Sequence, residues 1–325
     1  MADRQGFAGG AGLITAVLAL GLLLAAYAAP GRFPTWAFPA ANSKPPTAGW
    51  SQTRLLHLPG SSLAFTEART RDPLAPPDWF PQRHQPAPAI ILTGRSEALR
   101  PCGYCHLPDG SGRPENAALA GLPAAYIRQQ VAAFRSGARR GAVADWGPSS
   151  GMAEVAAHAT DAQTAAAAAY FASIRFKGHV RVVETARISG AVAKGYLLMP
   201  VPGHGEPLGQ RIVEGPSSFE RFERRDPTLI YTAYAPPGSL ARGAELARNG
   251  AGGAPCVSCH GAGLKGGEIG PPLAGRSPSY LFRQLYGFQT GARTDPQAAP
   301  MRQLAGRLSQ ADMIALAAYA ASRTP

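Results

Sequence analysis

Cysteine and histidine occur in one short pattern that the chain uses twice. The segment Cys102–His106 reads C-G-Y-C-H and the segment Cys256–His260 reads C-V-S-C-H, and together they hold all four cysteines of the 325 residues. In such a pattern both sulfurs can bond along one edge of a porphyrin while the adjacent imidazole ligates its iron. A redox C-x-x-C is usually sought near a βαβ pattern, and a structural zinc site needs two more thiols or imidazoles nearby; neither accompanies these segments. The pattern predicts two covalently attached haem c groups, bound through Cys102, Cys105 and His106 in the first segment and Cys256, Cys259 and His260 in the second.

The two patterns open a longer internal repeat. The sequence matches itself without a gap at a spacing of 154 residues, from the cysteines to Arg139 and Arg293. The matches include Leu-Ala-Gly at 119–121 and 273–275, and Gly-Ala-Arg at 137–139 and 291–293. Self-similarity of this kind means that one structural unit is used twice. We therefore expect one haem domain in each repeat, at residues 88–176 and 238–325.

Each repeat carries helical patterns. Apolar residues follow each Leu-Ala-Gly turn at helical spacing: Ile127, Val131 and Phe134 in the first repeat, and Leu281, Leu285 and Phe288 in the second. Thr160 and Ser309 each begin a pattern typical of a capping box, which predicts a closing helix after them. The chain is therefore predicted to be mainly α, with two helical domains in tandem.

Two methionines occupy equivalent places in the repeats. Met152 lies eight residues before Thr160 and Met301 lies eight residues before Ser309, each in a stretch rich in Gly, Pro and Ser that we expect to be a loop. A thioether opposite the imidazole raises the iron potential and closes the metal to small molecules. We predict Met152 and Met301 as the distal ligands. His158 is an alternative to Met152, but Arg307 stands at its equivalent position.

These motifs together resemble class I cytochromes c, and the tandem arrangement resembles the di-haem cytochromes c of the c-four group. The resemblance covers the two repeats and implies two cytochrome c-like domains that transfer electrons, with no catalytic residue. It also implies that Gly243 and Ala244 pack against the closing helix. The first repeat departs from the family at one place. It has Ala117-Ala118 where the second repeat has Pro271-Pro272, the position at which the family has a proline. Because the carbonyl at this place orients the proximal imidazole in the family, we expect unequal haem potentials.

Three segments lie outside the repeats. Within residues 1–30, an uncharged apolar run at 11–29 follows Arg4, so we expect export to the bacterial periplasm. Its length favours an inner-membrane anchor, while Ala26-Tyr27-Ala28 offers a cleavage site for a signal peptide. Residues 31–87 are rich in proline and predict irregular chain that covers the first domain or spaces it from the membrane. Residues 177–237 predict a small β insert, with strands at 180–183 and 196–199.

Charge and cofactor together limit the function. The net charge is +12, and the second repeat has nine basic and four acidic residues, which predicts docking to acidic redox proteins such as a terminal oxidase or a dehydrogenase. Nucleic acid is excluded as a partner outside the cytoplasm. We expect an electron carrier in a respiratory chain. The alternatives are the cytochrome subunit of a membrane dehydrogenase and a di-haem cytochrome c peroxidase, which needs a haem with an open distal face and acid–base groups nearby.

Overall fold

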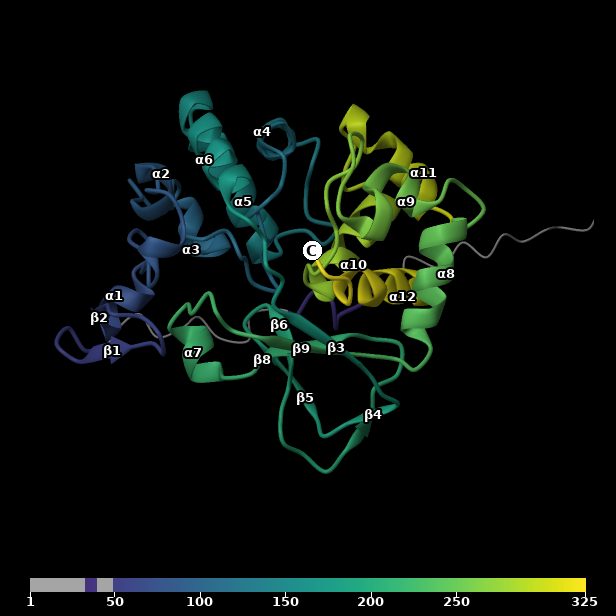
Figure 1. Ribbon diagram of the computed structural model, residues 1–325, viewed down its shortest axis with the longest axis horizontal. Helices are drawn as coiled ribbons and strands as arrows, with labels where there is room; N and C mark the ends of the chain where they lie inside the picture. The colour runs from purple at the N-terminus through teal and green to yellow at the C-terminus, as the bar shows by residue number, and fades with distance from the viewer. Residues whose placement is uncertain (1–32, 40–48) are drawn as a thin grey trace, which may run out of the picture. The chain divides into compact units, whose positions relative to one another are not determined.

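Helices make up most of both repeats and come in the same order in each (Figure 1). The computed structural model describes residues 33–39 and 49–325. The first repeat contains α2 (Ala89–Leu92), α3 (Cys102–His106), α4 (Ala124–Arg135), α5 (Gly147–His158) and α6 (Asp161–Ser173). The second contains α8 (Ser239–Asn249), α9 (Cys256–His260), η2 (Ala262–Leu264), α10 (Pro278–Gln289), η3 (Pro296–Ala298), α11 (Ala299–Ala305) and α12 (Gln310–Ala321). The predicted fold class, mainly α with two cytochrome c-like domains in tandem, is confirmed.

Both predicted capping boxes are present at the closing helices. The Thr160 hydroxyl accepts from the Gln163 amide at 3.1 Å, and the Gln163 side chain accepts from the Thr160 amide at 2.9 Å. Ser309 and Asp312 make the same reciprocal pair at the start of α12, at 3.1 and 3.3 Å. Each pair satisfies backbone donors that a helix start otherwise leaves unpaired, so α6 and α12 begin where the sequence predicts.

Strands gather in the insert between the repeats. It contains β3 (Val180–Glu184), β4 (Arg187–Ile188), β5 (Ala191–Lys194), β6 (Leu197–Pro200), β7 (Glu206–Pro207), β8 (Val213–Pro216), α7 (Phe219–Glu223) and β9 (Tyr231–Ala235). β9 pairs in parallel with β3 and antiparallel with β8, which makes one three-stranded sheet. The antiparallel pairs β5–β6 and β4–β7 are separate. The β insert and both of its predicted strands are confirmed, the second shifted by one residue.

The proline-rich extension contains more regular structure than we expected. Its described part includes β1 (Leu55–His57), β2 (Ala64–Thr66), α1 (Glu67–Arg71) and η1 (Pro81–Arg83), and β1 pairs antiparallel with β2. Leu56, Phe65, Trp79 and Phe80 form a small cluster of their own. The Trp79 indole donates to the Arg224 carbonyl at 2.8 Å. Aromatic residues that show no period along the sequence thus form a core and attach the extension to the insert.

One hydrophobic cluster contains side chains from the extension, from both repeats and from the insert. Phe38 of the extension lies 5.5 Å from Trp146 of the first repeat, ring centre to ring centre. The same cluster includes Ile212 of the insert and Phe282 and Met313 of the second repeat, all nearly inaccessible to solvent. Residues 34–325 accordingly form one compact unit. Separating the repeats would expose this shared apolar surface to water.

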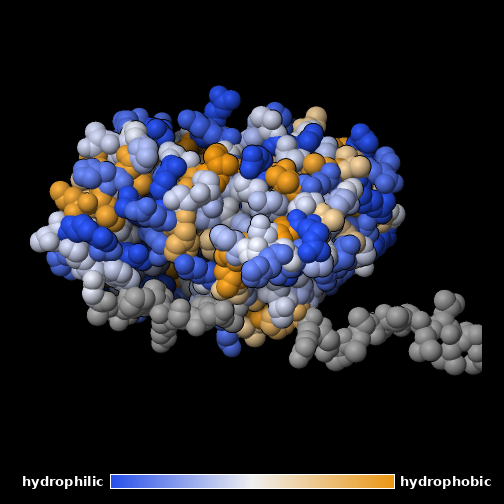
Figure 2. Space-filling model, turned by 90° about the horizontal axis from the view of Figure 1, so that it is seen from below, coloured by the Kyte–Doolittle hydropathy of each residue, from blue (hydrophilic) through white to orange (hydrophobic). Residues whose placement is uncertain are grey.

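The surface on the side of the β hairpins is mainly hydrophilic, with hydrophobic residues in small groups (Figure 2). Among the described residues, no helix is long and apolar enough to span a membrane. The apolar run at 11–29, which we predict to be an anchor or a signal peptide, lies outside the residues described.

Helices α8 and α12 of the second repeat cross in direct backbone contact at Gly243. A Cβ atom at this position would lie 2.2 Å from the Ala315 carbonyl oxygen and 2.5 Å from Tyr319 Cβ. The expected packing of Gly243 against the closing helix is confirmed, and Ala244 beside it is half-buried. Only a residue without a side chain allows this crossing.

Replacing Gly243 with alanine should lower the free energy of unfolding by about 1–3 kcal/mol, the usual cost of overpacking. Alanine gains about 1 kcal/mol of helix propensity over glycine, so the steric clash must exceed that gain. Denaturant unfolding followed by far-UV circular dichroism measures the difference. Gly287→Ala in α10 is the matched control, because a Cβ there meets only the Arg293 side chain at 3.9 Å; a destabilisation equal to that of Gly243→Ala would contradict the steric account.

A buried histidine fastens the extension to the first repeat. His84 Nε2 lies 3.2 Å from Asp78 Oδ1, and its Nδ1 lies 2.9 Å from the Tyr170 hydroxyl of α6. Tyr170 in turn donates to the Pro108 carbonyl at 2.8 Å. The hydrogen bond that the His84 imidazole donates to Asp78 raises the pKa of His84 above its ordinary value of 6.5, against the opposing effect of burial, and the charge of Asp109 also favours the cation.

Because the pKa of His84 is raised on folding, its protonation stabilises the fold below the ordinary pKa, and this contribution is lost as the pH rises through the raised value. His84→Gln should therefore destabilise the protein by roughly 1.5–3 kcal/mol at about pH 5.5, the range for hydrogen bonds to charged groups, and by less at about pH 8.5. Denaturant unfolding at both pH values measures this. If His84→Gln lowered the free energy of unfolding more at high pH than at low pH, the neutral imidazole would be the stabilising form.

Candidate functional site

Each C-x-x-C-H segment folds as one turn of helix. α3 and α9 both follow a proline, Pro101 or Pro255, and both end at the histidine, and the next residue has a positive φ in each case. Residues three apart in a helix share one face, so the two sulfurs of each segment are neighbours. None of the four cysteines is joined to another by a disulfide bond, so all four are available to bond to a porphyrin. This is the arrangement that bonding to one edge of a porphyrin requires.

The imidazoles of the two C-x-x-C-H segments, which we predict to be the proximal ligands, are each oriented by a backbone carbonyl. His106 Nδ1 lies 2.8 Å from the Ala117 carbonyl oxygen, and His260 Nδ1 lies 2.8 Å from that of Pro271. With Nδ1 engaged, Nε2 is the nitrogen that remains for a metal. Burial lowers the pKa of both imidazoles, which keeps them in the neutral form that binds metals. The missing proline of the first repeat therefore does not alter this hydrogen bond, since any residue supplies a carbonyl.

The loop after each histidine places that carbonyl. The amides of Gly112 and Gly266 donate to the carbonyls of His106 and His260 at 2.9 and 2.8 Å. Gly112 has φ +72°, and a Cβ there would lie 2.5 Å from the Ala118 amide nitrogen. Glycine is therefore required at this point, because the chain must double back closely to present the Ala117 carbonyl to the imidazole.

The two predicted distal methionines lie in helices rather than in loops. Met152 is half-buried in α5, and Met301 is half-buried in α11, where it packs on Phe288, Ala298 and Ala305. Both helices have proline in the first turn, where its missing N–H costs no hydrogen bond, so a proline-containing sequence here still forms a helix. The alternative ligand His158 is exposed and its Nδ1 lies 2.9 Å from the Glu154 carbonyl oxygen.

The repeats meet through equivalent residues. Arg139 donates to Gln130 at 2.6 Å and to Gln284 at 2.7 Å, while Arg293 donates to Gln130 at 2.6 Å and to Gln284 at 3.3 Å. The backbones of Arg139 and Arg293 form an antiparallel bridge. Because each arginine and glutamine has its counterpart 154 residues away, the contact has the symmetry of a pseudo-twofold pair.

These interface arginines are buried without carboxylate partners. Arg139 is 8% and Arg293 is 5% exposed, and Arg293 Nε has no hydrogen-bond partner among the described residues. Burial, followed by the positive charge of Arg139, lowers the pKa of Arg293. Two adjacent buried cations need a negative charge nearby. The propionate carboxylates of a bound haem would supply such charges, so the buried arginines of this interface fit that group, as the thiols and imidazoles do.

Sequence reasoning missed two further buried cations, Arg276 and Arg283. Arg276 donates to the carbonyls of Ala118 and Ala120 across the interface, at 2.5 and 3.1 Å. Arg283 donates to the Pro114 carbonyl of the first repeat. Burial lowers the pKa of each to about 10. Neither position has an arginine at the equivalent place in the first repeat, so comparison of the two repeats could not single out these arginines.

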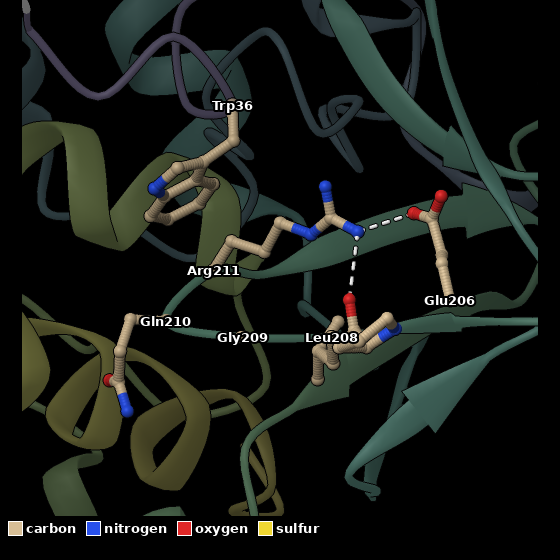
Figure 3. Close-up of a pocket in the computed structure, with 7 residues that line it drawn as sticks. Trp36, Glu206, Leu208, Gly209, Gln210 and Arg211 are labelled. Carbon is tan, nitrogen blue, oxygen red and sulfur yellow. Dashed lines mark hydrogen bonds and ion pairs between the residues drawn. The ribbon is translucent and has the colours of Figure 1, made fainter.

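A shallow pocket of about 480 Å³ lies away from both C-x-x-C-H segments. Trp36 and residues 206–211 line it, and Arg211 pairs there with Glu206 (Figure 3). Arg211 also donates to the Pro207 carbonyl at 3.2 Å. The pocket contains none of the predicted haem-binding residues, and the Nε of Arg211 has no hydrogen-bond partner among the described residues.

Comparisons with known proteins agree with this geometry. A family model described as cytochrome c matches residues 240–323. Cytochrome c-554(548) of Halomonas halodenitrificans is 38% identical over 69 residues, which are 21% of this chain and 83% of that protein. The thiosulfate dehydrogenase electron acceptor of Thiomonas intermedia is 28% identical over 240 residues, 73% of this chain and 84% of that protein. Cytochrome c4 of Azotobacter vinelandii is 27% identical over 226 residues, 67% of this chain and 82% of that protein.

The sequence motif, the repeated geometry and these relatives lead to one conclusion. The chain carries two covalently attached haem c groups, one for each C-x-x-C-H segment. Its fold repeats the same helical unit around each segment. The chain belongs to the cytochrome c family.

Proposed function

We propose that this di-haem cytochrome accepts electrons singly from a dehydrogenase outside the cytoplasm and passes them to a further carrier or oxidase, without a substrate of its own. Relatives that align over most of the chain are named as electron acceptors of thiosulfate dehydrogenase. An enzyme that oxidises thiosulfate is therefore the first donor to test. The basic net charge of +12 suits an acidic partner.

The observation that carries this proposal is the equivalence of the two sites. The imidazole-to-carbonyl distance is 2.8 Å in both repeats, and each repeat has a methionine eight residues before its closing cap. A peroxidase needs one haem that differs from the other, with an open distal face. Two sites built alike support transfer of electrons rather than activation of peroxide.

We also propose the ligand set of each iron. Cys102 and Cys105, and Cys256 and Cys259, would hold the porphyrins, with His106 and His260 as proximal ligands and Met152 and Met301 as distal ligands. The bound iron supplies the redox chemistry by cycling between its ferrous and ferric states. The protein holds each imidazole neutral and fixed, and a buried leucine, Leu107 or Leu264, lies in the loop after each histidine, 2% and 1% exposed. The interface arginines hold the two repeats in one arrangement.

For location, we propose that residues 11–29 direct the chain across the inner membrane of a bacterium. The run is uncharged and apolar, and Arg4 precedes it, as export segments require. Its length favours an anchor that keeps the cytochrome at the periplasmic surface. Amino-terminal sequencing of the protein from membranes distinguishes an intact anchor from cleavage after Ala28.

The carrier function predicts two one-electron reductions and no peroxide turnover in the purified, full-length holoprotein. A spectroelectrochemical titration measures the reductions, and addition of peroxide to the half-reduced form measures turnover. Because methionine ligation closes the distal face, both haems should stay low-spin throughout. A high-spin haem that consumes peroxide would establish a peroxidase instead.

Met301→Leu should lower the midpoint potential of one haem, by a sizeable part of the roughly 0.8 V range that axial ligands span, and Met152→Leu should do so for the other. The reason is the loss of a thioether ligand at one iron. Met313→Leu is the matched control, because Met313 is 1% exposed in the core of the second repeat. If Met313→Leu moved a potential as far as Met301→Leu, packing rather than ligation would explain the effect.

A further inference from the structure

The surroundings of the two C-x-x-C-H segments differ in their exposure. In the second repeat, the loop after the histidine, residues 261–270, contains six exposed residues, and Ile269 is 79% exposed. The equivalent loop of the first repeat, residues 107–116, contains no exposed residue. The two loops match without a gap at the spacing of 154 residues. Their difference therefore reflects what packs on each loop and not their length.

The insert covers the loop of the first repeat. The Arg225 guanidinium lies 3.8 Å from the centre of the Tyr104 ring and donates to the Tyr104 carbonyl, within the C-x-x-C-H segment itself. Arg113 of the loop lies 3.7 Å from the centre of the Phe222 ring of α7. Glu115 pairs with Arg113 at 3.1 Å. A redox partner cannot approach this face without displacing the insert.

The matching face of the second repeat is open. Ser258 stands at the position of Tyr104 and is exposed. Ile269 is held beside the C-x-x-C-H segment, because the amide of the next residue, Gly270, donates to the Cys259 carbonyl at 3.1 Å. An exposed apolar side chain thus lies next to the porphyrin-binding turn.

Exposed cations lie on the segments next to the second C-x-x-C-H segment. Lys265 lies in the same exposed loop, with Glu268 as its acidic neighbour. Arg307 is exposed and donates to the Gly252 carbonyl just before the segment. Arg248 is exposed in the last turn of α8, the helix whose Leu246 carbonyl lies 3.9 Å from Cys256 Sγ. Three cations and one acid around an apolar centre favour a partner with carboxylates around an apolar patch.

We propose that acidic redox proteins dock on this one face of the second repeat, which we call the docking face and define by Arg248, Lys265, Ile269 and Arg307. The insert keeps the matching face of the first repeat closed, so partner exchange is confined to the docking face. The inference rests on the proposed electron-carrier function and adds the place of contact and the kind of partner.

Flavodoxin hydroquinone, a small acidic electron donor, provides the test with the full-length ferric holoprotein. Each encounter takes one electron from the flavin hydroquinone, which becomes the semiquinone, and reduces one ferric centre. Stopped-flow at low ionic strength measures the second-order rate constant. Ile269→Glu should lower it by at least about tenfold, and Lys265→Glu should lower it by several-fold, with both effects shrinking as salt is added.

Val192→Glu is the matched control, because Val192 is 43% exposed in β5 and the substitution changes the charge equally. Its rate constant should stay within about twofold of the unsubstituted protein, since repulsion between charges weakens with their distance from the contact. Equal slowing by Val192→Glu and Ile269→Glu, or an unchanged rate for Ile269→Glu, would overturn the docking face. Failure of the carrier function would appear separately, as peroxide turnover by the unsubstituted protein.

Discussion

The hydrogen bond between each proximal imidazole and a backbone carbonyl is the constraint on which the rest of each repeat depends. The Nδ1 atom of the ring lies 2.8 Å from the carbonyl oxygen in both repeats, so Nε2 is the nitrogen that can bind the iron in the ligation that we propose. The carbonyl can reach the ring only because the loop doubles back at Gly112 and Gly266 and bonds to the preceding histidine carbonyl. Further along each repeat, the amides of residues 119–120 and 273–274 donate to carbonyls of the same loop. The amides of Gly121 and Gly275 then donate to carbonyls of the closing helices α6 and α12. This series of hydrogen bonds connects the C-x-x-C-H segment to the closing helix of its repeat.

The pairing of the repeats depends on charge as much as on apolar packing. Arg139 and Arg293 are buried against two glutamines whose amide oxygens accept from both. Buried cations without carboxylate partners are costly in an empty protein, so the interface is suited to the protein with its haems attached. The insert adds Glu214, which is 1% exposed and bonds to Ser277 and Ser279 at the start of α10.

The features that occur in both repeats were predicted correctly from the sequence. The C-x-x-C-H segments, the capping boxes at Thr160 and Ser309 and the tandem helical fold all follow from local chemistry that occurs twice. Features that depend on contacts between distant segments were predicted less well. Proline near Met152 and Met301 indicated loops, but proline in the first turn of a helix costs little, and both lie in helices. The alanine pair before Leu119 led us to predict unequal haem potentials. The carbonyl contact with the imidazole is the same in both repeats, because a carbonyl does not depend on its side chain, and the difference in potential stays a prediction. The closure of the first face by Arg225 joins residues more than a hundred positions apart, and no periodicity signals it.

The central claim is that both irons are bound alike, by histidine and methionine, in a carrier that exchanges electrons singly. The most direct measurement is magnetic circular dichroism of the oxidised holoprotein in the near infrared, where ligand-to-iron charge-transfer bands identify the axial ligands of each low-spin haem. The account predicts bands of histidine–methionine ligation with the intensity of two haems. Bands of histidine–methionine ligation from only one haem, with a high-spin or bis-histidine signature from the other, would contradict it.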